Sequence, residues 1–279
     1  MTPSPPFDPV LLCPEDPPPF TCLNPEGQPR FLLTCDHASN AVPQHMAGLG
    51  LCKKVLNSHI AWDIGAAEVT SHMSQNLNAT AFLSGYSRLI IDCNRPLGSP
   101  TSITTVSDGI IIPANRTISE QEATARAEAF FWPYHRRISE TLDCLITRAA
   151  DSGETPTLVA MHSFTPQLVD GAPRPWHIGL LFEHDARLVA PLRNTLEALV
   201  PNICIGENEP YAIKGPSDYS IPEHGQNRGL PHIEIEIRQD LIDTPEGALL
   251  WAGRVAQALK IVCDENPPFE IISPVNSGP

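Results

Sequence analysis

The sequence predicts an α/β fold in which a mostly parallel sheet is covered by helices on both faces. Short runs rich in Val, Ile, Leu and Phe alternate along the chain with longer, helix-like runs. Strands separated by helices are typical of parallel sheets, because a parallel connection must cross over the sheet. Hydrophobic residues make up 42% of the 279 residues, which is enough for the core of such a fold. We see no internal repeat and no clear linker, and we therefore expect one domain.

Six runs have the composition of short strands and are bounded by Gly, Pro, Ser or Asn. These strands are expected at residues 31–35, 88–92, 157–161, 177–182, 203–207 and 232–237. Helices are expected over residues 61–76, 120–150, 186–200 and 246–262. Ser119 and Glu122 form a capping box at the start of the second helix, and Pro133 should kink or split it. Asp185 is a suitable N-cap for the third helix.

The two ends of the chain differ in composition from the part between them. Residues 1–30 contain ten prolines, and such a stretch can hold neither a helix nor a central strand. We expect this proline-rich arm to lie extended over the surface or to be partly disordered. Residues 267–279 are expected to form a second irregular tail, which leaves residues 31–266 as the folded domain.

The net charge of −14 argues against several classes of partner. It would repel the phosphate backbone of a nucleic acid, so we expect no nucleic-acid binding. No apolar run approaches the roughly 20 residues of a membrane span. The first residues lack the basic start and apolar run of a signal peptide. The eight cysteines are scattered without a Cys-x-x-Cys pair, so we expect most to be buried free thiols of a cytoplasmic enzyme.

Metal-binding and acid–base residue types stand where apolar runs end. Asp36 and His37 follow the first expected strand, and Asp63 follows an Ala-Trp pair. His162 follows a third apolar run, and Glu236 lies near the end of the last expected strand. An open α/β sheet places its chemistry at the ends of its strands. Two imidazoles with carboxylates nearby are typical of a zinc site that keeps one open position and uses a carboxylate base.

Each of these residues also has an ordinary structural interpretation. A single His after an apolar run is more often a hydrogen-bonding residue than a metal ligand. Asp36 could orient an imidazole instead of binding a metal itself. His59 and Asp63 are four residues apart, which would place them on one face of a helix as an ion pair or a cap.

The strand expected at residues 232–237 is polar on one side. His232, Glu234, Glu236 and Arg238 share one face by the two-residue period of a strand, and three isoleucines share the other. Such alternation fits an edge strand with a solvated face. It fits equally a strand whose charged face lines a cleft.

Basic and aromatic residues near these strand ends are candidates for binding a substrate. Asn94 and Arg95 follow an apolar stretch that Arg88 precedes, and an arginine can hold a carboxylate with two hydrogen bonds. For any single arginine, a surface salt bridge is the simpler interpretation. Tyr134 lies in a basic aromatic segment, and His224 lies in a long loop of the kind that often binds ligands.

Taken together, these segments resemble the N-formylglutamate amidohydrolase family over residues 31–262. The resemblance is carried by the order and spacing of six pieces, residues 35–43, 59–66, 86–96, 132–135, 162–166 and 229–240. Because the family is similar to the zinc carboxypeptidases, the resemblance implies a three-layer α/β/α sandwich of the phosphorylase/hydrolase type with a mixed, mostly parallel sheet. It also implies a zinc-dependent amidohydrolase that acts on a small anionic N-acyl amino acid.

The resemblance assigns roles to individual residues. His162 matches the second histidine ligand, and Glu236 matches the general base. Asn94 and Arg95 match a pair that grips a substrate carboxylate. The early ligand pair of the carboxypeptidases is His-x-x-Glu, but Asn40 stands at the place of the glutamate here. The carboxylate ligand must then come from another segment.

We therefore predict that His37, Asp63 and His162 hold Zn²⁺ or another divalent ion. In this hypothesis Glu236 takes a proton from water and passes it to the leaving amine, and Arg88 stabilises the developing oxyanion. The expected substrate contacts are Asn94, Arg95, Arg238, His224 and Tyr134. The candidates for a second basic anchor for a glutamate side chain are Arg228, Arg238 and Arg116.

The expected reaction is hydrolysis of N-formyl-L-glutamate to formate and L-glutamate, or of a related N-acyl amino acid or peptide-like amide. A second hypothesis is a metal-free protein on the same fold that binds a small carboxylate without turnover, and Asn40 favours it. A third hypothesis uses Cys35 or Ser163 as a nucleophile beside His37 or His162. Adjacent residues of a strand point to opposite faces, which argues against the third hypothesis.

Overall fold

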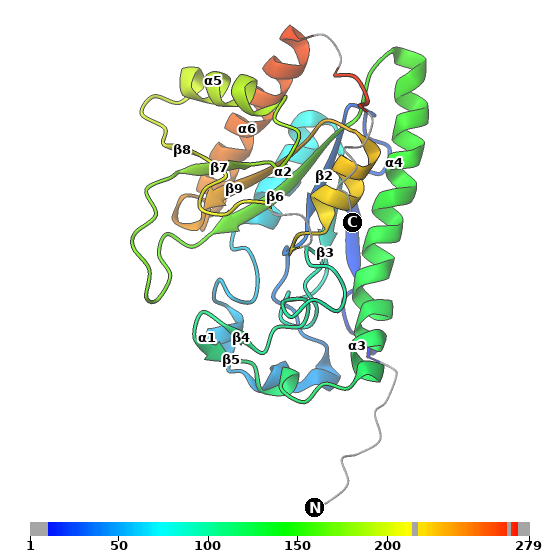
Figure 1. Cartoon of the computed structure of the whole chain (residues 1–279), viewed down its shortest axis with the longest axis vertical. Helices are drawn as coiled ribbons and strands as arrows, with labels where there is room; N and C mark the ends of the chain where they lie inside the picture. The colour runs from blue at the N-terminus through cyan, green and yellow to red at the C-terminus, as the bar shows by residue number, and fades with distance from the viewer. Residues whose placement is uncertain (1–10, 214–216, 267–268, 273–279) are drawn as a thin grey trace, which may run out of the picture.

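A sheet of seven strands runs through the centre of the computed structural model, which describes residues 11–213, 217–266 and 269–272 (Figure 1). In spatial order the strands are β1 (Phe20–Leu23), β3 (Thr80–Ser84), β2 (Phe31–Cys35), β6 (Thr157–Phe164), β9 (His232–Arg238), β7 (Ile178–Leu181) and β8 (Ile205–Glu207). The pairs β3–β2, β2–β6, β6–β9 and β7–β8 are parallel, whereas β1–β3 and β9–β7 are antiparallel. The predicted mixed, mostly parallel sheet is confirmed.

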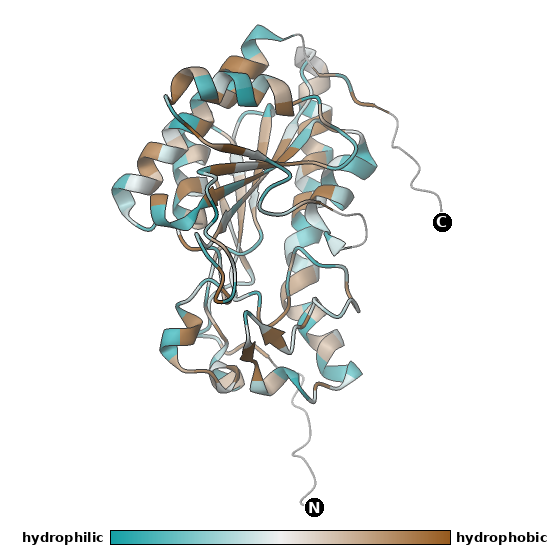
Figure 2. Ribbon diagram, turned by 60° about the vertical axis from the view of Figure 1, so that its left-hand side comes forward, coloured by the Kyte–Doolittle hydropathy of each residue, from teal (hydrophilic) through white to brown (hydrophobic). Residues whose placement is uncertain are grey.

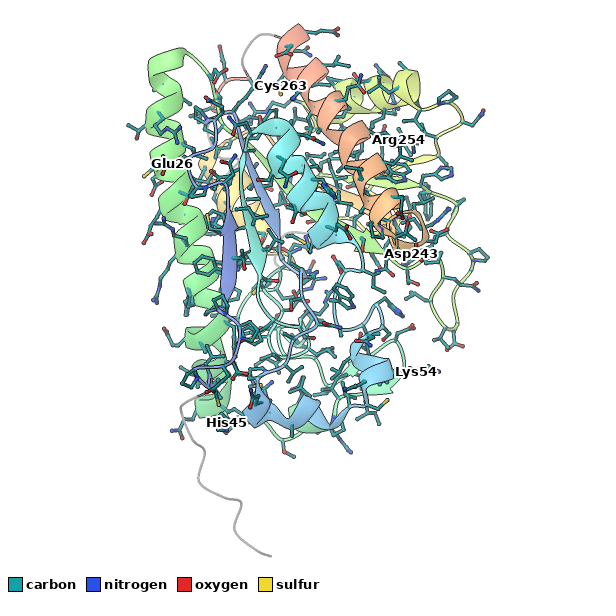
Figure 3. The ribbon with its side chains drawn as sticks, turned by 180° about the vertical axis from the view of Figure 1, so that it is seen from behind. Glu26, His45, Lys54, Asp243, Arg254 and Cys263 are labelled. Atoms are coloured by element: carbon teal, nitrogen blue, oxygen red, sulfur yellow. The ribbon has the colours of Figure 1, made fainter. Side chains whose placement is uncertain are left out.

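Helices cover both faces of the sheet and complete the three layers of an α/β/α sandwich. α2 (Ala66–Leu77), α5 (Val189–Leu199) and α6 (Pro245–Glu265) pack on one face, and α4 (Trp132–Ser152) packs on the other. Seen from behind, α2 and α6 lie across the front of the sheet while α4 runs along its left side (Figure 3). The sandwich predicted from the sequence is therefore present.

Side-chain alternation along β2 explains why both faces need a cover. Phe31 and Leu33 belong to the apolar core shared with α2 and α6, whereas Leu32 belongs to the core shared with α4. Successive residues of a strand point to opposite faces, and all five residues of β2 are buried, so both faces of the sheet are covered here. Figure 2 shows these hydrophobic strands enclosed between the helices.

A third group of segments lies beyond the carboxyl ends of β2, β3, β6 and β9, in the lower part of Figure 1. Its helices and strands are α1 (Lys53–Leu56), β4 (Val106–Ser107), β5 (Ile110–Ile111) and α3 (Glu120–Arg126). Its short 3-10 turns include Gln44–Gly50 and Pro113–Asn115. An apolar cluster of its own, including Leu89, Ile90 and Phe131, holds these segments together. The space between this part and the sheet contains the site described below.

Residues 88–92 form a turn, so the strand predicted there is wrong. Ile90 donates its backbone N–H to the Ser87 carbonyl at 3.0 Å, and the buried guanidinium of Arg126 donates to the Ile90 carbonyl at 2.9 Å. The apolar side chains fill the lower cluster instead of a sheet. β2 lies between β6 and β3, and β3 is a strand that was not predicted from the sequence. The other five predicted strands are confirmed with small shifts of their ends.

A helix is present in each of the four predicted regions, but several helix boundaries differ from the prediction. The first helix begins at Ala66, because Gly65 adopts a left-handed φ of 80° and residues 61–65 form a turn. The second is divided as Pro133 suggested, with a π-helical segment (Ala127–Phe131) between α3 and α4. Ser119 caps α3 through the Glu122 N–H. Asp185 does not cap α5; it accepts hydrogen bonds from Arg187 at a turn before the helix.

Part of the proline-rich arm joins the sheet as strand β1, which is antiparallel to β3. β1 lies at the edge of the sheet, so the arm contains no central strand, as predicted. Residues 1–10 of the arm, and residues 267–268 and 273–279 of the expected tail, lie outside the described residues. All eight cysteines are free, but only Cys35 and Cys93 are buried, so the expectation of mostly buried thiols is wrong. No helix in the described ranges is long and apolar enough to cross a membrane.

Candidate metal and catalytic site

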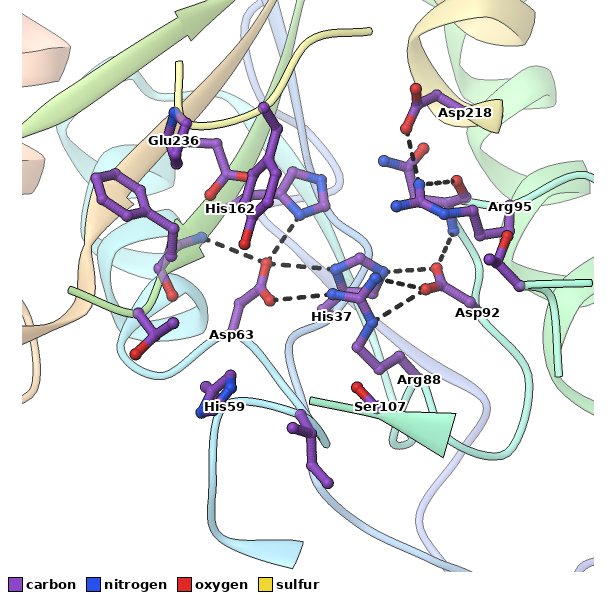
Figure 4. Close-up of a pocket in the computed structure, with 18 of the residues that line it drawn as sticks. His37, His59, Asp63, Arg88, Asp92, Arg95, Ser107, His162, Asp218 and Glu236 are labelled. Atoms are coloured by element: carbon purple, nitrogen blue, oxygen red, sulfur yellow. Dashed lines mark hydrogen bonds and ion pairs between the residues drawn. The ribbon is translucent and has the colours of Figure 1, made fainter. Parts of the chain in front are cut away.

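The predicted ligands meet in a pocket at the carboxyl ends of β2, β6 and β9 (Figure 4). Its volume is about 820 Å³, and its lining comes from both the sheet and the lower part of the molecule. The strand ends supply His37, His162 and Glu236, whereas Asp63 comes from the turn before α2. The sheet thus brings together residues that lie up to 200 positions apart in the chain, as expected for chemistry at strand ends.

His37, Asp63 and His162 form the candidate metal-binding group. Their potential ligand atoms all lie within 4.8 Å of one another, and all three side chains are buried. Oδ2 of Asp63 lies 3.3 Å from His37 Nδ1 and 2.8 Å from His162 Nδ1. The three side chains predicted as ligands therefore converge on one point through the atoms that could coordinate an ion.

The backbone holds Asp63 at this point. Its N–H donates to the His37 carbonyl at 2.9 Å, which fixes the turn 58–65 against the end of β2. The Ser163 N–H donates to Asp63 Oδ2 at 3.3 Å, and Arg88 Nη1 lies 3.7 Å from Oδ1. Because His59 and Asp63 precede α2, they do not share a helix face. His59 instead pairs with Asp108 at 3.0 Å on the rim of the pocket.

Each of the two histidines has a second carboxylate next to its Nε2 atom. His37 Nε2 lies 2.7 Å from Asp92 Oδ1, and His162 Nε2 lies 3.3 Å from Asp36 Oδ2. Tyr134 donates its hydroxyl to the other oxygen of Asp36 at 2.8 Å. A histidine that keeps its proton on a carboxylate presents the opposite nitrogen as a ligand, and metal-binding histidines commonly have this arrangement. The donor set of two imidazoles and one carboxylate thus fits a catalytic zinc site.

The charges of this group shift the pKa values of its members. Burial would raise the pKa of Asp36, but the hydrogen bond and charge of His162 lower it to about 2. Burial also works against ionised Asp63 and Asp92, yet the histidines, and Arg88 for Asp92, hold both pKa values well below the usual range. Burial would lower the pKa of His162, but the surrounding carboxylates raise it well above its usual value.

Glu236 stands beside the ligands with one oxygen unpaired. It lies opposite His162 in the β6–β9 register, is 6% exposed and lines the pocket. Oε2 has no hydrogen-bond partner among the described residues. Burial raises the pKa of Glu236 to about 8, although the charge of His162 opposes the rise. The strand lies between β6 and β7, so the polar face of β9 lines a pocket and is not a solvated edge.

The arginines and Asn94 also lie at the pocket. Arg88 donates from Nε and Nη2 to Asp92 Oδ2, at 3.0 and 2.6 Å, and its Nη1 faces Asp63. Arg95 donates to Asp218 at 2.7 Å, as Figure 4 shows. The Asn94 side-chain oxygen accepts hydrogen bonds from two backbone N–H groups of residues 219–220. Asn94 therefore orders a loop at the pocket, and its oxygen is already used.

Three of the predicted substrate contacts, Tyr134, His224 and Arg238, are not among the residues that line the pocket. Tyr134 is fully buried and supports Asp36, so it acts on His162 through that carboxylate. His224 is buried against His135, with 2.9 Å between their ring nitrogens. Arg238, the last residue of β9, pairs with Asp240 and donates hydrogen bonds to the carbonyls of residues 174–176. All three side chains are thus already held by interactions within the protein.

The candidates for a second basic anchor also lie away from this pocket. Arg228 pairs with Asp143 on the outer side of α4, and Arg116 lines a small separate hollow near β5. The candidate nucleophiles are likewise engaged. Ser163 donates its hydroxyl to the Ile64 carbonyl at 2.8 Å, and burial raises the pKa of Cys35 to about 12. A thiol so far from ionisation is a poor nucleophile.

Among the pocket residues that were not predicted as site residues, four are charged or polar groups close to the chemistry of the site: Asp92, Asp218, Tyr211 and Glu234. Asp92 was read as the end of a strand, and Asp218 and Tyr211 lie in the long loop for which only His224 was named. Glu234 was noted on the same face as Glu236, and the two-residue period of β9 could have placed it in the pocket.

The protein thus has an α/β fold with a pocket of acid–base and potential metal-binding residues at the carboxyl edge of its sheet. The family model of N-formylglutamate amidohydrolase matches residues 30–243, and the chain belongs to that family. Membership of this family places the chain among the amidohydrolases. No curated protein matches the chain.

Two solved structures are similar to this chain over most of its length. The gene product Atu2144 from Agrobacterium tumefaciens is 32% identical, with a TM-score of 0.84, and the match covers 91% of this chain and 98% of that one. An N-formylglutamate amidohydrolase from Ralstonia eutropha JMP134 is 18% identical, with a TM-score of 0.63, and the match covers 88% and 97%. The second likeness supports the fold alone.

Proposed function

We propose that the protein is a metal-dependent amidohydrolase that cleaves the amide bond of an N-acyl amino acid, with N-formyl-L-glutamate as the reference substrate and formate and L-glutamate as its products. The observation that carries this proposal is the convergence of His37, Asp63 and His162 beside Glu236. Family membership supports the amide as the bond that is cleaved. Zinc is the ion that this donor set favours, although another divalent ion could take its place.

His37, Asp63 and His162 would hold the ion. When bound, it would supply Lewis-acid polarisation of the substrate carbonyl and would lower the pKa of a nearby water. Asp92 and Asp36 keep the two imidazoles oriented with Nδ1 toward the site, which prepares them before an ion arrives. The pocket gives a substrate access to this point.

Glu236 would carry the proton in the reaction. Its unpaired Oε2 is available to accept a proton from water and to return it to the leaving nitrogen. A divalent cation nearby would lower the pKa of Glu236 from its raised value toward neutrality, where proton transfer in both directions is most efficient.

The two arginines would handle the negative charges of the substrate. Arg88 faces the site through Nη1 while Asp92 holds the rest of its guanidinium, so it is placed to stabilise an oxyanion without reorganising. Arg95 lines the same pocket and uses Nη1 to bind Asp218. The rest of its guanidinium is our candidate to hold the substrate's α-carboxylate.

A hydrolysis assay tests the proposal. Purified protein with one equivalent of zinc is given N-formyl-L-glutamate and other N-formyl and N-acetyl amino acids, with and without a chelator. Metal-dependent release of the free amino acid supports the proposal. Bound zinc with no turnover of any N-acyl amino acid overturns it. Tight carboxylate binding without zinc would instead favour the metal-free binding protein, for which Asn40 was the motivation.

A further inference from the structure

The reference substrate, N-formyl-L-glutamate, carries two carboxylates, and Arg95 is the candidate partner of the α-carboxylate alone. Among the residues that the structure describes, the basic side chains that line the pocket are His37, His59, Arg88, Arg95 and His162. His37 and His162 are the proposed metal ligands, and Arg88 is already paired with carboxylates of the site. His59 is therefore the basic side chain that remains for the second carboxylate, at the end of the glutamate side chain.

His59 lies in the turn that leads to Asp63. Ala61 donates its N–H to the Ser58 carbonyl at 3.1 Å, which closes this turn around His59. The His59 side chain is 26% exposed, and its Nε2 lies 3.0 Å from Asp108 Oδ2, an ion-pair contact without hydrogen-bond geometry. An imidazolium carries a donor on each ring nitrogen, so Nδ1 is left for a ligand while Nε2 faces Asp108.

Asp108 is itself held in place on the rim of the pocket. It forms with Gly109 the two-residue turn between β4 and β5, and the left-handed φ values of 41° and 75° belong to the hairpin turn that an Asp-Gly pair favours. The Val169 N–H, in the loop after β6, donates to Asp108 Oδ1 at 3.4 Å. One carboxylate oxygen thus contacts a second loop while the other faces His59, so the imidazole is oriented before a substrate arrives.

The same hairpin brings a hydroxyl group to the pocket. Ser107, the last residue of β4, lines the pocket and directly precedes Asp108. In Figure 4, His59 and Ser107 lie on the lower side of the pocket, Arg95 lies on its right-hand side, and the candidate metal ligands lie between them. A substrate whose amide is at the metal could therefore reach Arg95 with one carboxylate and His59 with the other. The imidazole and the hydroxyl would each supply a donor to that second carboxylate.

We propose that His59 and Ser107 form the subsite for the side-chain carboxylate of the substrate, and that Asp108 holds the imidazole in place. This inference rests on the proposed function and gives its preference for an acidic side chain a structural basis. His59 is a specificity-determining residue, and it takes no part in metal binding or bond cleavage.

The test compares zinc-loaded wild type and His59→Gln on N-formyl-L-glutamate and on N-formyl-L-norleucine, whose side chain has no carboxylate. We expect the ratio of kcat/KM for the glutamate derivative to that for the norleucine derivative to fall by at least about tenfold in His59→Gln, mainly through KM, because a charge-assisted hydrogen bond is lost. Ser107→Ala removes a neutral donor and should lower the same ratio by about threefold. The matched control is His72→Gln on α2, an imidazole of similar exposure outside the pocket lining, which should keep the wild-type ratio.

Two results would overturn the subsite: a wild-type enzyme that does not favour the glutamate derivative, or a preference for it that His59→Gln leaves intact. If neither derivative is hydrolysed, the proposed function fails, and calorimetric binding of both compounds to the zinc-loaded proteins then decides the subsite separately. Binding of the glutamate derivative that weakens by about tenfold in His59→Gln but not in His72→Gln supports the subsite. No binding to wild type, or equal binding to wild type and His59→Gln, contradicts it.

Discussion

Two pairs of histidines lie close together in this protein, equally buried but differently surrounded. His37, His162, His135 and His224 are each 2% exposed. The first two face carboxylates with both ring nitrogens, and His162 Nε2 lies 3.3 Å from Asp36 without forming a hydrogen bond. His135 contacts His224 and the Cys93 carbonyl, and one ring nitrogen of His224 has no partner among the described residues.

The difference shows that partners, and not burial, decide what a buried histidine can do. Carboxylates raise the pKa of His162 well above its usual value despite burial. Burial lowers the pKa of His135 to about 4 and that of His224 to about 3, and the positive charge of His135 lowers His224 further. The carboxylates around the first pair would balance the charge of a cation, whereas the second pair is neutral and packs between α4 and the π-helical segment Ile221–Gly225.

The largest expected effect is a loss of turnover at Glu236, and it separates the proton transfer from the metal binding by His37, Asp63 and His162. Glu236→Gln should reduce turnover by about 10²–10⁴-fold, because the group that moves the proton is lost. Zinc content should stay at the wild-type level, since Glu236 is not one of the ligands. Steady-state kinetics together with metal analysis checks both points. A variant that keeps wild-type turnover would show that Glu236 is not the base.

The next largest effect is a loss of zinc affinity at Asp92, one of the carboxylates that face the first pair of histidines. Asp92→Asn should weaken zinc binding by about 10–100-fold, because His37 would lose the partner that orients its ring. Competition with a chromophoric chelator measures this affinity. The same change in Asp143, an exposed carboxylate on α4, is the matched control and should leave the affinity unchanged. Equal affinities in wild type and Asp92→Asn would mean that the backing carboxylate does not support the ligand.

His224 of the neutral pair should make the free energy of unfolding depend on pH. In the unfolded chain His224 takes up a proton below about pH 6.5, but the folded protein resists this until near pH 3. Stability is therefore lost as pH falls below 6.5. His224→Gln keeps a hydrogen-bonding side chain without the titration. The free energy of unfolding of wild type should thus fall relative to this variant by about 2 kcal/mol between pH 7 and pH 5.

Urea unfolding of both proteins at several pH values measures this difference, and the comparison cancels the titration of shared groups such as Glu236. Parallel pH profiles for the two proteins would mean that His224 is not held neutral in the fold. The variant should also retain its zinc, in contrast to any change of the first pair.

The smallest effect is expected at a third imidazole, His59, which lines the pocket but is no ligand. Its ion pair with Asp108 is partly exposed, with side chains 26% and 13% accessible. Asp108→Asn should change stability by less than about 1 kcal/mol. Zinc content should not change. Loss of zinc in this variant, measured by metal analysis, would show that His59 also contributes to the metal site.

Much of the fold and the centre of the site could be predicted from the sequence. The mostly apolar runs of β2 and β6 and the alternating pattern of β9 could be recognised as strands, and His37, His162 and Glu236 lie at or near their carboxyl ends. Failures occurred where tertiary contacts override composition. The apolar run 88–92 packs as a turn held by the buried Arg126, a partner that lies 36 positions from Ile90.

The supporting residues were harder to predict for the same reason. The sequence shows only that Tyr134 lies in an aromatic and basic segment, but its place on α4 directs its hydroxyl to Asp36. Asp92 was hidden inside the mistaken strand. Local patterns thus identify the residues at strand ends, whereas the groups that orient them come from distant segments that only the assembled fold brings together.

The central claim is that His37, Asp63 and His162 form a metal centre, and zinc content per chain tests it most directly. Wild-type protein purified without chelator, or supplied with zinc and then dialysed, should hold about one zinc per chain. His162→Ala should hold almost none, and His224→Gln should match wild type. No zinc in wild-type protein after supply, or equal zinc in wild type and His162→Ala, would contradict the account.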